Sequence, residues 1–415
     1  MDAQTPGDGL TLLATPADGV PPVVSTRSGL EGVVAALRQG SGPVAVDTER
    51  AHGFRYSTRA YLIQVRRAGA GTHLIDPIPF WEGDSPADLS ELGQVTDADP
   101  WIIHAATQDM PCLAEVGIRP AAVFDTERAG RLLGWEKVGL GSMIERVFGL
   151  RLAKEHSAAD WSTRPLPDSW LTYAALDVEL LIELREHMVV ELADQGRLEW
   201  AAQEFAHLAE HGADPAPERP DPWRRTSGIQ HVRTPLGLAV VRALWQTRDD
   251  LAKTLDKAPS KLLKDTAITD LAASVSNRRR VDRAMLRDIE GFERRAAHRY
   301  ESRWLTAAEQ AVELPKSQRP TMRVKPTGMP NPKSWSRNAP DADARRVRMR
   351  AAMDALAETH GVAADVILSP ALWRELAWNP CPADPTSVDA RLAEAGARPW
   401  QRALTAPVLA EALTA

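Results

Sequence analysis

Two acidic residues, Asp47 and Glu49, follow a short apolar run at residues 44–46. The run is bounded by Gly42-Pro43, and this pattern favours a buried β-strand over a helix. Residues two apart on a strand project from the same face, so the two carboxylates are expected side by side. Such a pair repels itself unless a cation lies between the groups. The pattern therefore predicts a site for a hard divalent cation such as Mg²⁺ or Mn²⁺, although an isolated Asp-Thr-Glu is usually a solvated strand end.

Three further residues complete a set that can cleave a phosphodiester bond. Asp109 follows a predicted strand at residues 101–103, in a loop that enters a helix, and such strand ends often carry site residues. Tyr173 and Asp177 are four residues apart on a predicted helix and therefore share one face. The four carboxylates can hold two cations that clamp the attacking and leaving oxygens, and the tyrosine can orient or help to deprotonate the attacking water. Each residue alone is weak evidence, because a helical Asp is usually only solvated and a Tyr usually packs in a core.

Several segments resemble, in type and order, the three exonuclease motifs of the ribonuclease D family. They are Asp47-Thr48-Glu49, Tyr61-Leu62-Ile63-Gln64, the Asp109 segment, and the stretch from Lys154 through Ser157-Ala-Ala-Asp-Trp161-Ser-Thr-Arg164-Pro165-Leu166 to Tyr173-Ala-Ala-Leu-Asp177-Val178. The resemblance covers about residues 25–210, and its third motif is the most specific part. This family belongs to the tyrosine-containing branch of the DEDD superfamily of 3′-to-5′ exonucleases. The resemblance therefore implies an RNase H-like fold for this part of the chain.

The resemblance also implies a role for each of the five residues above. Asp47, Glu49, Asp109 and Asp177 match the ligands of two divalent metal ions, Mg²⁺ or Mn²⁺, and Tyr173 matches the tyrosine that positions water. The expected function is trimming of RNA 3′ ends, in tRNA precursors and other structured RNAs, with release of nucleoside 5′-monophosphates. Two alternatives stay open, a DNA 3′-to-5′ exonuclease in repair and a non-catalytic RNA-binding scaffold.

Residues beside the motifs are candidates for substrate contact. Arg50 stands where the family often has an aromatic residue, and an arginine there can contact a phosphate or a base. The other candidates along the path of the strand are Gln64, Lys154, Trp161 and Arg164. Core packing is the more common role for a tryptophan such as Trp161. His104 is interpreted as a structural hydrogen-bonding residue rather than a ligand.

The apolar pattern predicts an α/β part followed by an all-α part. A chain of 415 residues suggests two or three domains at about 150 residues each. Residues 1–25 are expected to form an arm or an edge strand, and the α/β part a mixed sheet flanked by helices. The predicted strands are residues 44–46, 61–65, 73–76 and 101–103, and the predicted helices are residues 28–39, 88–92, 109–116, 127–133, 142–148 and one long helix over 168–194.

A proline-rich stretch at residues 214–222 marks a domain boundary, because its four prolines cannot continue a helix. The predicted domains are an arm at 1–25, an exonuclease domain at 26–212, a first helical domain at 225–310, a basic proline-rich linker at 311–340 and a second helical domain at 341–415. By order, length and helical pattern, both helical domains resemble HRDC domains, the nucleic-acid-binding modules that follow the nuclease in ribonuclease D.

Positive charge gathers in the second half of a chain whose net charge is −6. Residues 224–303 contain 18 Lys and Arg against 10 Asp and Glu, and residues 316–350 contain 10 against 2. Such clustering indicates a surface for a polyanion. We expect RNA as the partner, with its body on the basic helical domains and its 3′ end in the acidic site.

Other features of the sequence favour a cytoplasmic protein. The two cysteines, Cys112 and Cys381, are far apart and lie in no metal motif, which fits a reducing compartment. The start of the chain lacks a secretory signal, and no apolar run reaches the length of a membrane helix. We therefore expect a soluble protein, no membrane partner and a monomer.

Overall fold

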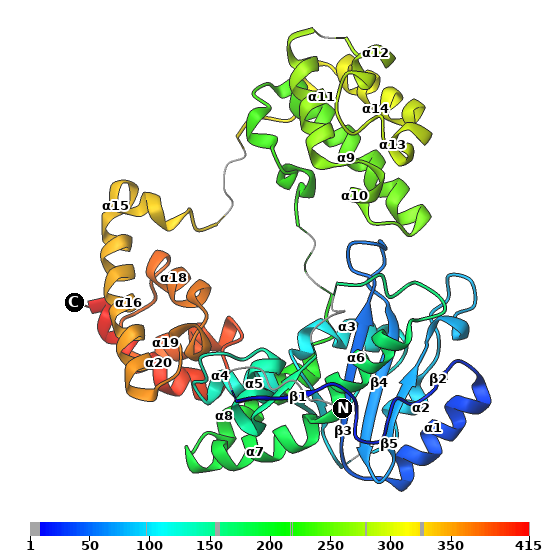
Figure 1. The fold of residues 1–415 in the computed structure, drawn as a ribbon. Helices are drawn as coiled ribbons and strands as arrows, with labels where there is room; N and C mark the ends of the chain where they lie inside the picture. The colour runs from blue at the N-terminus through cyan, green and yellow to red at the C-terminus, as the bar shows by residue number, and fades with distance from the viewer. Residues whose placement is uncertain are drawn as a thin grey trace.

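A computed structural model describes residues 9–96, 98–153, 158–215, 217, 219–278, 280–323 and 328–414, with only the backbone for 276–278. The chain forms three units (Figure 1): an α/β unit up to residue 212, a first helical unit from residue 222 to 313, and a second helical unit from residue 332 to 414. The expected order of a mixed α/β part followed by helical parts is confirmed. Lys154 lies outside the described residues.

A six-stranded mixed sheet forms the centre of the α/β unit, with the order β2-β5-β4-β3-β6-β7. The acidic strand β3 lies in the interior, antiparallel to β4 and parallel to β6. The strands are β2 (Val23–Val24), β3 (Ser41–Arg50), β4 (Ala60–Ala68), β5 (Gly71–Ile75), β6 (Trp101–Ile103) and β7 (Val123–Asp125). A separate parallel pair joins β1 (Thr11–Leu13) to β8 (Leu150–Leu152), so the N-terminal arm supplies one strand of this pair and also the edge strand β2.

Helices cover both faces of the sheet (Figure 1). On one face, Val44 and Val46 of β3 pack with residues of the first three helices, including Leu30. On the other face, Leu62 and Leu74 pack with residues of α6. The helices are α1 (Arg27–Gln39), α2 (Ser90–Gly93), α3 (Met110–Glu115), α4 (Thr126–Leu132), α5 (Leu140–Phe148), α6 (Asp168–Glu179), α7 (Leu181–Asp194) and α8 (Leu198–His211), with two 3₁₀ turns, η1 (Ile78–Phe80) and η2 (Ala106–Gln108). Strand β3 is therefore held between two apolar layers.

The long helix predicted over residues 168–194 is divided at Leu180, so this prediction was wrong. Leu180 leaves the helical region with φ −117° and ψ 12°. The two halves pack on largely different partners: α6 on β3, β4 and β5, and α7 mainly on α4, with smaller contacts to α5, α8, β3 and β6. No Pro or Gly marks the break, because it is imposed by packing rather than by local backbone preference.

The first helical unit has its own core and meets the α/β unit through the loop after β3. Its long helix α9 ends at Leu255, and Asp256 caps it with a left-handed φ of 44°. The Asp256 carboxylate accepts hydrogen bonds from Ser57 N at 2.8 Å and from the Tyr61 hydroxyl at 3.3 Å. The elements are η3 (Pro222–Arg225), η4 (Ile229–His231), α9 (Pro235–Leu255), α10 (Pro259–Leu262), α11 (Asp265–Arg278), α12 (Arg283–Arg287), α13 (Arg295–Arg299) and α14 (Glu301–Glu313).

The second helical unit begins earlier than predicted. Trp335, assigned above to a linker, is fully buried and packs against Trp378 with ring centroids 4.9 Å apart. Helix α20 packs on α8, where Trp400 stacks on Trp200 at 4.7 Å. The elements after α14 are η5 (Lys316–Gln318), η6 (Pro332–Ser334), α15 (Trp335–Asn338), α16 (Pro340–His360), α17 (Ala364–Ile367), α18 (Pro370–Trp378), α19 (Pro385–Glu394) and α20 (Pro399–Thr414).

Both helical units therefore contact the α/β unit, the first through Asp256 and the second through Trp400, so the second helical unit folds back onto the first part of the chain (Figure 1). Among the described residues, no helix combines the length and the apolarity needed to cross a membrane.

Candidate active site

Strand β3 and helix α6 bring three carboxylates together. Asp47 and Glu49 project from the face of β3 that α6 covers, and α6 carries Asp177. One carboxylate oxygen from each residue lies within 4.8 Å of the others, close enough to share a metal ion. The predicted convergence of these residues, distant in sequence, is thus present in the structure.

Asp109 lines the same cavity as these three carboxylates, but it comes from the segment before α3 and contacts Thr48 on the opposite face of β3. It precedes α3, and its carboxylate accepts a 2.6 Å hydrogen bond from the Thr48 hydroxyl. Thr48 alternates with its acidic neighbours and faces the α3 side of the strand, where it also lies 3.3 Å from Cys112 Sγ. The hydroxyl between the two acidic residues of β3 therefore fixes the orientation of Asp109.

The loop that carries Asp109 is fixed by a second buried carboxylate. Asp125, at the end of β7, accepts hydrogen bonds from the backbone N–H groups of Ala105 at 3.2 Å and Ala106 at 2.9 Å. Ala105 has a φ of 58°, a left-handed conformation that is unfavourable for alanine. The two bonds to Asp125 hold this turn and direct the chain towards Asp109.

The four carboxylates line one cavity of about 400 Å³, together with Tyr173 and His104. Burial, and then repulsion between the carboxylates, raises the pKa of Glu49 to about 9. Burial likewise raises the pKa of Asp177 to about 7 and that of Asp109 to about 6, and it raises the pKa of Asp47 well above its ordinary value. Four crowded carboxylates offer only hard oxygen donors, a set that fits Mg²⁺ or Mn²⁺ better than Zn²⁺.

Tyr173 stands beside the cluster as a protonated phenol. Its hydroxyl is hydrogen-bonded to the Asp177 carboxylate, and its ring lies 6.4 Å from that of Trp161. Burial and the adjacent carboxylates raise the pKa of the phenol above its ordinary value. The hydroxyl therefore keeps its proton at neutral pH, so it can orient a water molecule but is a poor base.

Arg50 and His104 border the cavity without joining the carboxylates. Arg50 Nη1 donates a 2.7 Å hydrogen bond to the Gln108 carbonyl, which leaves the side chain half-buried at the edge of the site. His104 Nδ1 lies 2.9 Å from the Thr126 hydroxyl, and burial lowers its pKa to about 4. The histidine is thus neutral and hydrogen-bonded, as its structural interpretation predicts.

Three residues expected on the substrate path are instead part of the framework. Gln64 and Trp161 have no solvent exposure. Arg164 forms a two-pronged ion pair with Asp76, at 2.7 and 2.8 Å, and also donates to the Tyr61 carbonyl at 2.8 Å. Their prediction as substrate contacts is not supported by these positions, because Gln64 and Trp161 are enclosed and Arg164 holds the segment before α6 on the sheet.

Sequence reasoning did not single out Thr48 and Asp125 as parts of the site. Thr48 had a usable signal, since it separates the two acidic residues of β3. Asp125 caps α4 through Arg128 N at 3.0 Å, and its sequence context predicts only that capping role. Its second role depends on the tertiary contact with the Ala105 turn.

Comparisons with protein-family models divide the chain in the same way. Residues 21–193 match the 3′-5′ exonuclease family, residues 237–307 match the HRDC domain, and residues 328–413 match the family described as the 3′ to 5′ exonuclease C-terminal domain. The third match begins near residue 328, in agreement with the buried Trp335.

Curated relatives are ribonucleases D. The protein of Gluconacetobacter diazotrophicus is 34% identical over 263 residues, which is 61% of this chain and 63% of that protein. The protein of Zymomonas mobilis is 30% identical over 278 residues, which is 65% of this chain and 68% of that protein. The matched segment thus spans less than two thirds of the first of these relatives.

Solved structures extend the likeness to the whole chain. A protein from Bifidobacterium adolescentis is 36% identical, with a TM-score of 0.88 over 98% of this chain and 100% of that one. Escherichia coli RNase D, described as an exoribonuclease involved in structured RNA processing, is 22% identical, with a TM-score of 0.65 over 94% of this chain and 98% of that one, a likeness of fold.

Proposed function

Since this chain belongs to the ribonuclease D family, we propose that it is a metal-dependent 3′-to-5′ exoribonuclease that releases nucleoside 5′-monophosphates from RNA 3′ ends. One observation carries the proposal: Asp47, Glu49, Asp109 and Asp177 line one small cavity beside Tyr173. An array of buried carboxylates without a neutralising partner is costly for a stable fold, and such groups gather where a cation is to be bound.

The proposed ligands of two divalent cations are these four carboxylates. When bound, such cations supply the positive charge that stabilises the phosphodiester transition state and lowers the pKa of the attacking water. Without positive charge, the site would repel the phosphate of an incoming RNA end.

Each remaining residue then has a defined task. Thr48 holds the Asp109 carboxylate in place through its 2.6 Å hydrogen bond. The Tyr173 hydroxyl donates a hydrogen bond to the Asp177 carboxylate, and its oxygen can accept a hydrogen bond from the attacking water. Arg50 lies at the cavity edge, where its guanidinium can contact a phosphate. We propose tRNA precursors and other structured RNAs as substrates, and the cytoplasm as the place of action.

The test uses single-stranded RNA with a label at the 5′ end, incubated with purified protein and Mg²⁺ or Mn²⁺. We expect a ladder that shortens from the 3′ end, with 5′-monophosphate products. The Asp47→Asn variant should lose activity at least about a thousandfold, because a lost cation removes several kcal/mol of transition-state stabilisation. Full activity of Asp47→Asn would refute the proposal.

A DNA strand of the same sequence supplies the second arm of the test. The cation chemistry is identical for both polymers, and only contacts to the 2′-hydroxyl separate them. Faster digestion of RNA supports an exoribonuclease, whereas faster digestion of DNA assigns the protein to the DNA exonucleases.

A further inference from the structure

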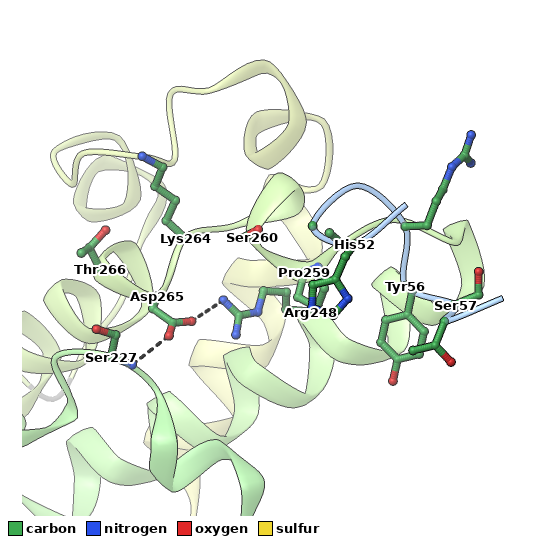
Figure 2. Close-up of a pocket in the computed structure, with 14 residues that line it drawn as sticks. His52, Tyr56, Ser57, Ser227, Arg248, Pro259, Ser260, Lys264, Asp265 and Thr266 are labelled. Carbon is green, nitrogen blue, oxygen red and sulfur yellow. Dashed lines mark hydrogen bonds and ion pairs between the residues drawn. The ribbon is translucent and has the colours of Figure 1, made fainter. Parts of the chain in front are cut away.

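Residues 52–58, in the loop after β3, line two cavities where the α/β unit meets the first helical unit. The larger, about 720 Å³, is drawn in Figure 2, and one of its two arginines, Arg248, is already neutralised. Arg248 Nη1 lies 2.7 Å from the Asp265 carboxylate, which also accepts a 2.8 Å hydrogen bond from Ser227 N. That cavity is thus built around an internal ion pair, which leaves Arg55 and Lys264 as its remaining cationic side chains.

The second cavity, about 580 Å³, has a different character, and we call it the junction groove. It is lined by five cationic side chains and a single carboxylate, with two aromatic rings: Arg55, Lys257, Lys261, Arg295, Arg299, Asp160, Phe54 and Tyr300, beside Leu262 and Ala296. The four cations of the helical unit are exposed. Within the described parts of the chain, none of these four forms an ion pair with a carboxylate.

Side chains of the junction groove are arranged before any ligand arrives. Arg55 Nε donates a 2.8 Å hydrogen bond to the Ser162 hydroxyl, and Ser162 is bonded in turn to Asp160. The two terminal nitrogens of Arg55 have no acceptor among the residues that the structure describes. The Lys261 ammonium lies 4.6 Å from the centre of the Phe54 ring. Positive charge next to aromatic faces is the combination that single-stranded nucleic acids bind.

The two units meet through backbone as well as side chains at this groove. Ala258 N donates a 3.0 Å hydrogen bond to the Phe54 carbonyl, and Ser57 N donates to Asp256. On the α/β side, the groove residues lie five or six positions beyond Glu49 and in the segment that leads into α6. The first segment thus follows β3, which carries Asp47 and Glu49, and the second leads into α6, which carries Asp177.

We propose that the junction groove binds the ribose-phosphate backbone of the single-stranded RNA segment that lies 5′ of the nucleotide being removed. The inference rests on the proposed function, since it takes the 3′ end of that strand to lie in the carboxylate cavity. Cations from the helical unit and Arg55 from the α/β unit contact successive phosphates. The HRDC unit then serves the exonuclease through a binding site that neither unit forms alone.

Binding is measured without cleavage, so that this inference can fail separately from the proposed function. The full-length Asp47→Asn protein is titrated with labelled oligouridylate of about 12 nucleotides, within the range of single-strand site sizes, and of about 3 nucleotides. Adding Lys261→Ala and Arg299→Ala should weaken binding of the longer RNA about tenfold. The slope of log affinity against log salt should fall by about 1.4, which corresponds to two lost phosphate contacts on a single strand. The shorter RNA should lose much less affinity.

Matched variants control for charge and folding. Arg119→Ala with Arg233→Ala also removes two exposed cations, one from each unit and neither from the groove. This pair should leave affinity and salt slope unchanged. The charge-conserving Lys261→Arg with Arg299→Lys should restore most of the binding. Equal losses in the groove and control pairs, or none in either, would overturn the proposal. Absence of RNA cleavage by the wild-type protein would instead count against the proposed function.

Discussion

At the scale of single residues, the site depends on carboxylates whose burial lowers the stability of the folded protein. Glu49 is 8% exposed and Asp109 is 4% exposed, and each lies near other carboxylates. Burial and mutual repulsion disfavour their charged forms, so the metal-free protein keeps protons on the cluster that a cation would displace. The same burial that destabilises the charged cluster makes it a strong cation site.

Because the Glu49 carboxylate is buried, the stability of the metal-free protein should depend on pH. The pKa of Glu49 in the folded protein, about 9, lies above its ordinary value of 4.5. A raised folded pKa means that stability is fully present below about pH 4.5 and is lost as the pH rises towards 9. With a chelator present to remove metal ions, the Tm should therefore decrease as the pH is raised from about 5 to about 9. Glu49→Gln should make this decrease smaller.

Thermal unfolding followed by circular dichroism, with and without Mn²⁺, measures this effect. Mn²⁺ should raise the Tm of the wild-type protein more than that of Glu49→Gln. The exposed Glu82→Gln is the matched control and should behave as wild type. A Glu49→Gln protein whose Tm falls with pH as steeply as that of the wild type would contradict the raised pKa.

Thr48 should act as a positioning residue for Asp109. Thr48→Val keeps the shape of the side chain but removes the 2.6 Å hydrogen bond to the carboxylate. Hydrogen bonds to charged groups contribute about 1.5–3 kcal/mol, so kcat should fall at least about tenfold. The metal concentration needed for half-maximal activity should rise, and Thr48→Ser should restore both values. A Thr48→Val enzyme with an unchanged metal requirement would exclude this role.

At the scale of elements, the sequence predicts those whose pattern is local. Strand β3 and helix α1 follow from a bounded apolar run and from Leu30, Val33, Val34 and Leu37 at helical spacing. Strands β7 and β8 were not predicted, because their sequences, Val-Phe-Asp and Leu-Arg-Leu, lack the continuous apolar run that marks the equally short β6. The break at Leu180 and the buried Trp335 depend on distant partners, which local patterns do not contain. The site was predictable because its residues are recognisable in type, whereas the side chains that hold them act through tertiary contacts.

A substitution of Arg164 can distinguish a residue that contacts RNA from one that holds the site elements in place. It joins the segment before α6 to β4 and β5, through Tyr61 and Asp76. Arg164→Ala leaves the nearly buried Asp76 without its cation and should cost about 2 kcal/mol of unfolding free energy. Because α6 carries Tyr173 and Asp177, kcat should fall together with the Tm, and Arg164→Lys should recover only part of both. If Arg164 contacted RNA instead, KM would rise while the Tm stayed the same.

At the scale of the whole molecule, the second helical unit is joined to the α/β unit by buried groups far apart in sequence. Glu204 on α8 is 2% exposed and accepts hydrogen bonds from Arg398 Nε at 2.7 Å and from Trp400 Nε1 at 3.0 Å. Trp400 N also donates to the Gln203 side chain at 2.9 Å. Nothing in the local sequence indicates these pairings, so the closure of the chain could not be predicted from it.

Loss of this contact should release the second helical unit without disabling the chemistry. Glu204→Ala leaves Arg398 Nε and the Trp400 indole N–H without their acceptor, at a cost of about 2 kcal/mol of docking free energy. We expect a larger radius of gyration in solution scattering and faster proteolysis near residues 314–323, between the two helical units, with short RNA still cleaved at the wild-type rate. The exposed Glu210→Ala on the same helix should change none of these. A compact Glu204→Ala protein that resists proteolysis like the wild type would mean that the remaining contacts, such as the Trp200–Trp400 stack and the Gln203–Trp400 hydrogen bond, hold the unit in place.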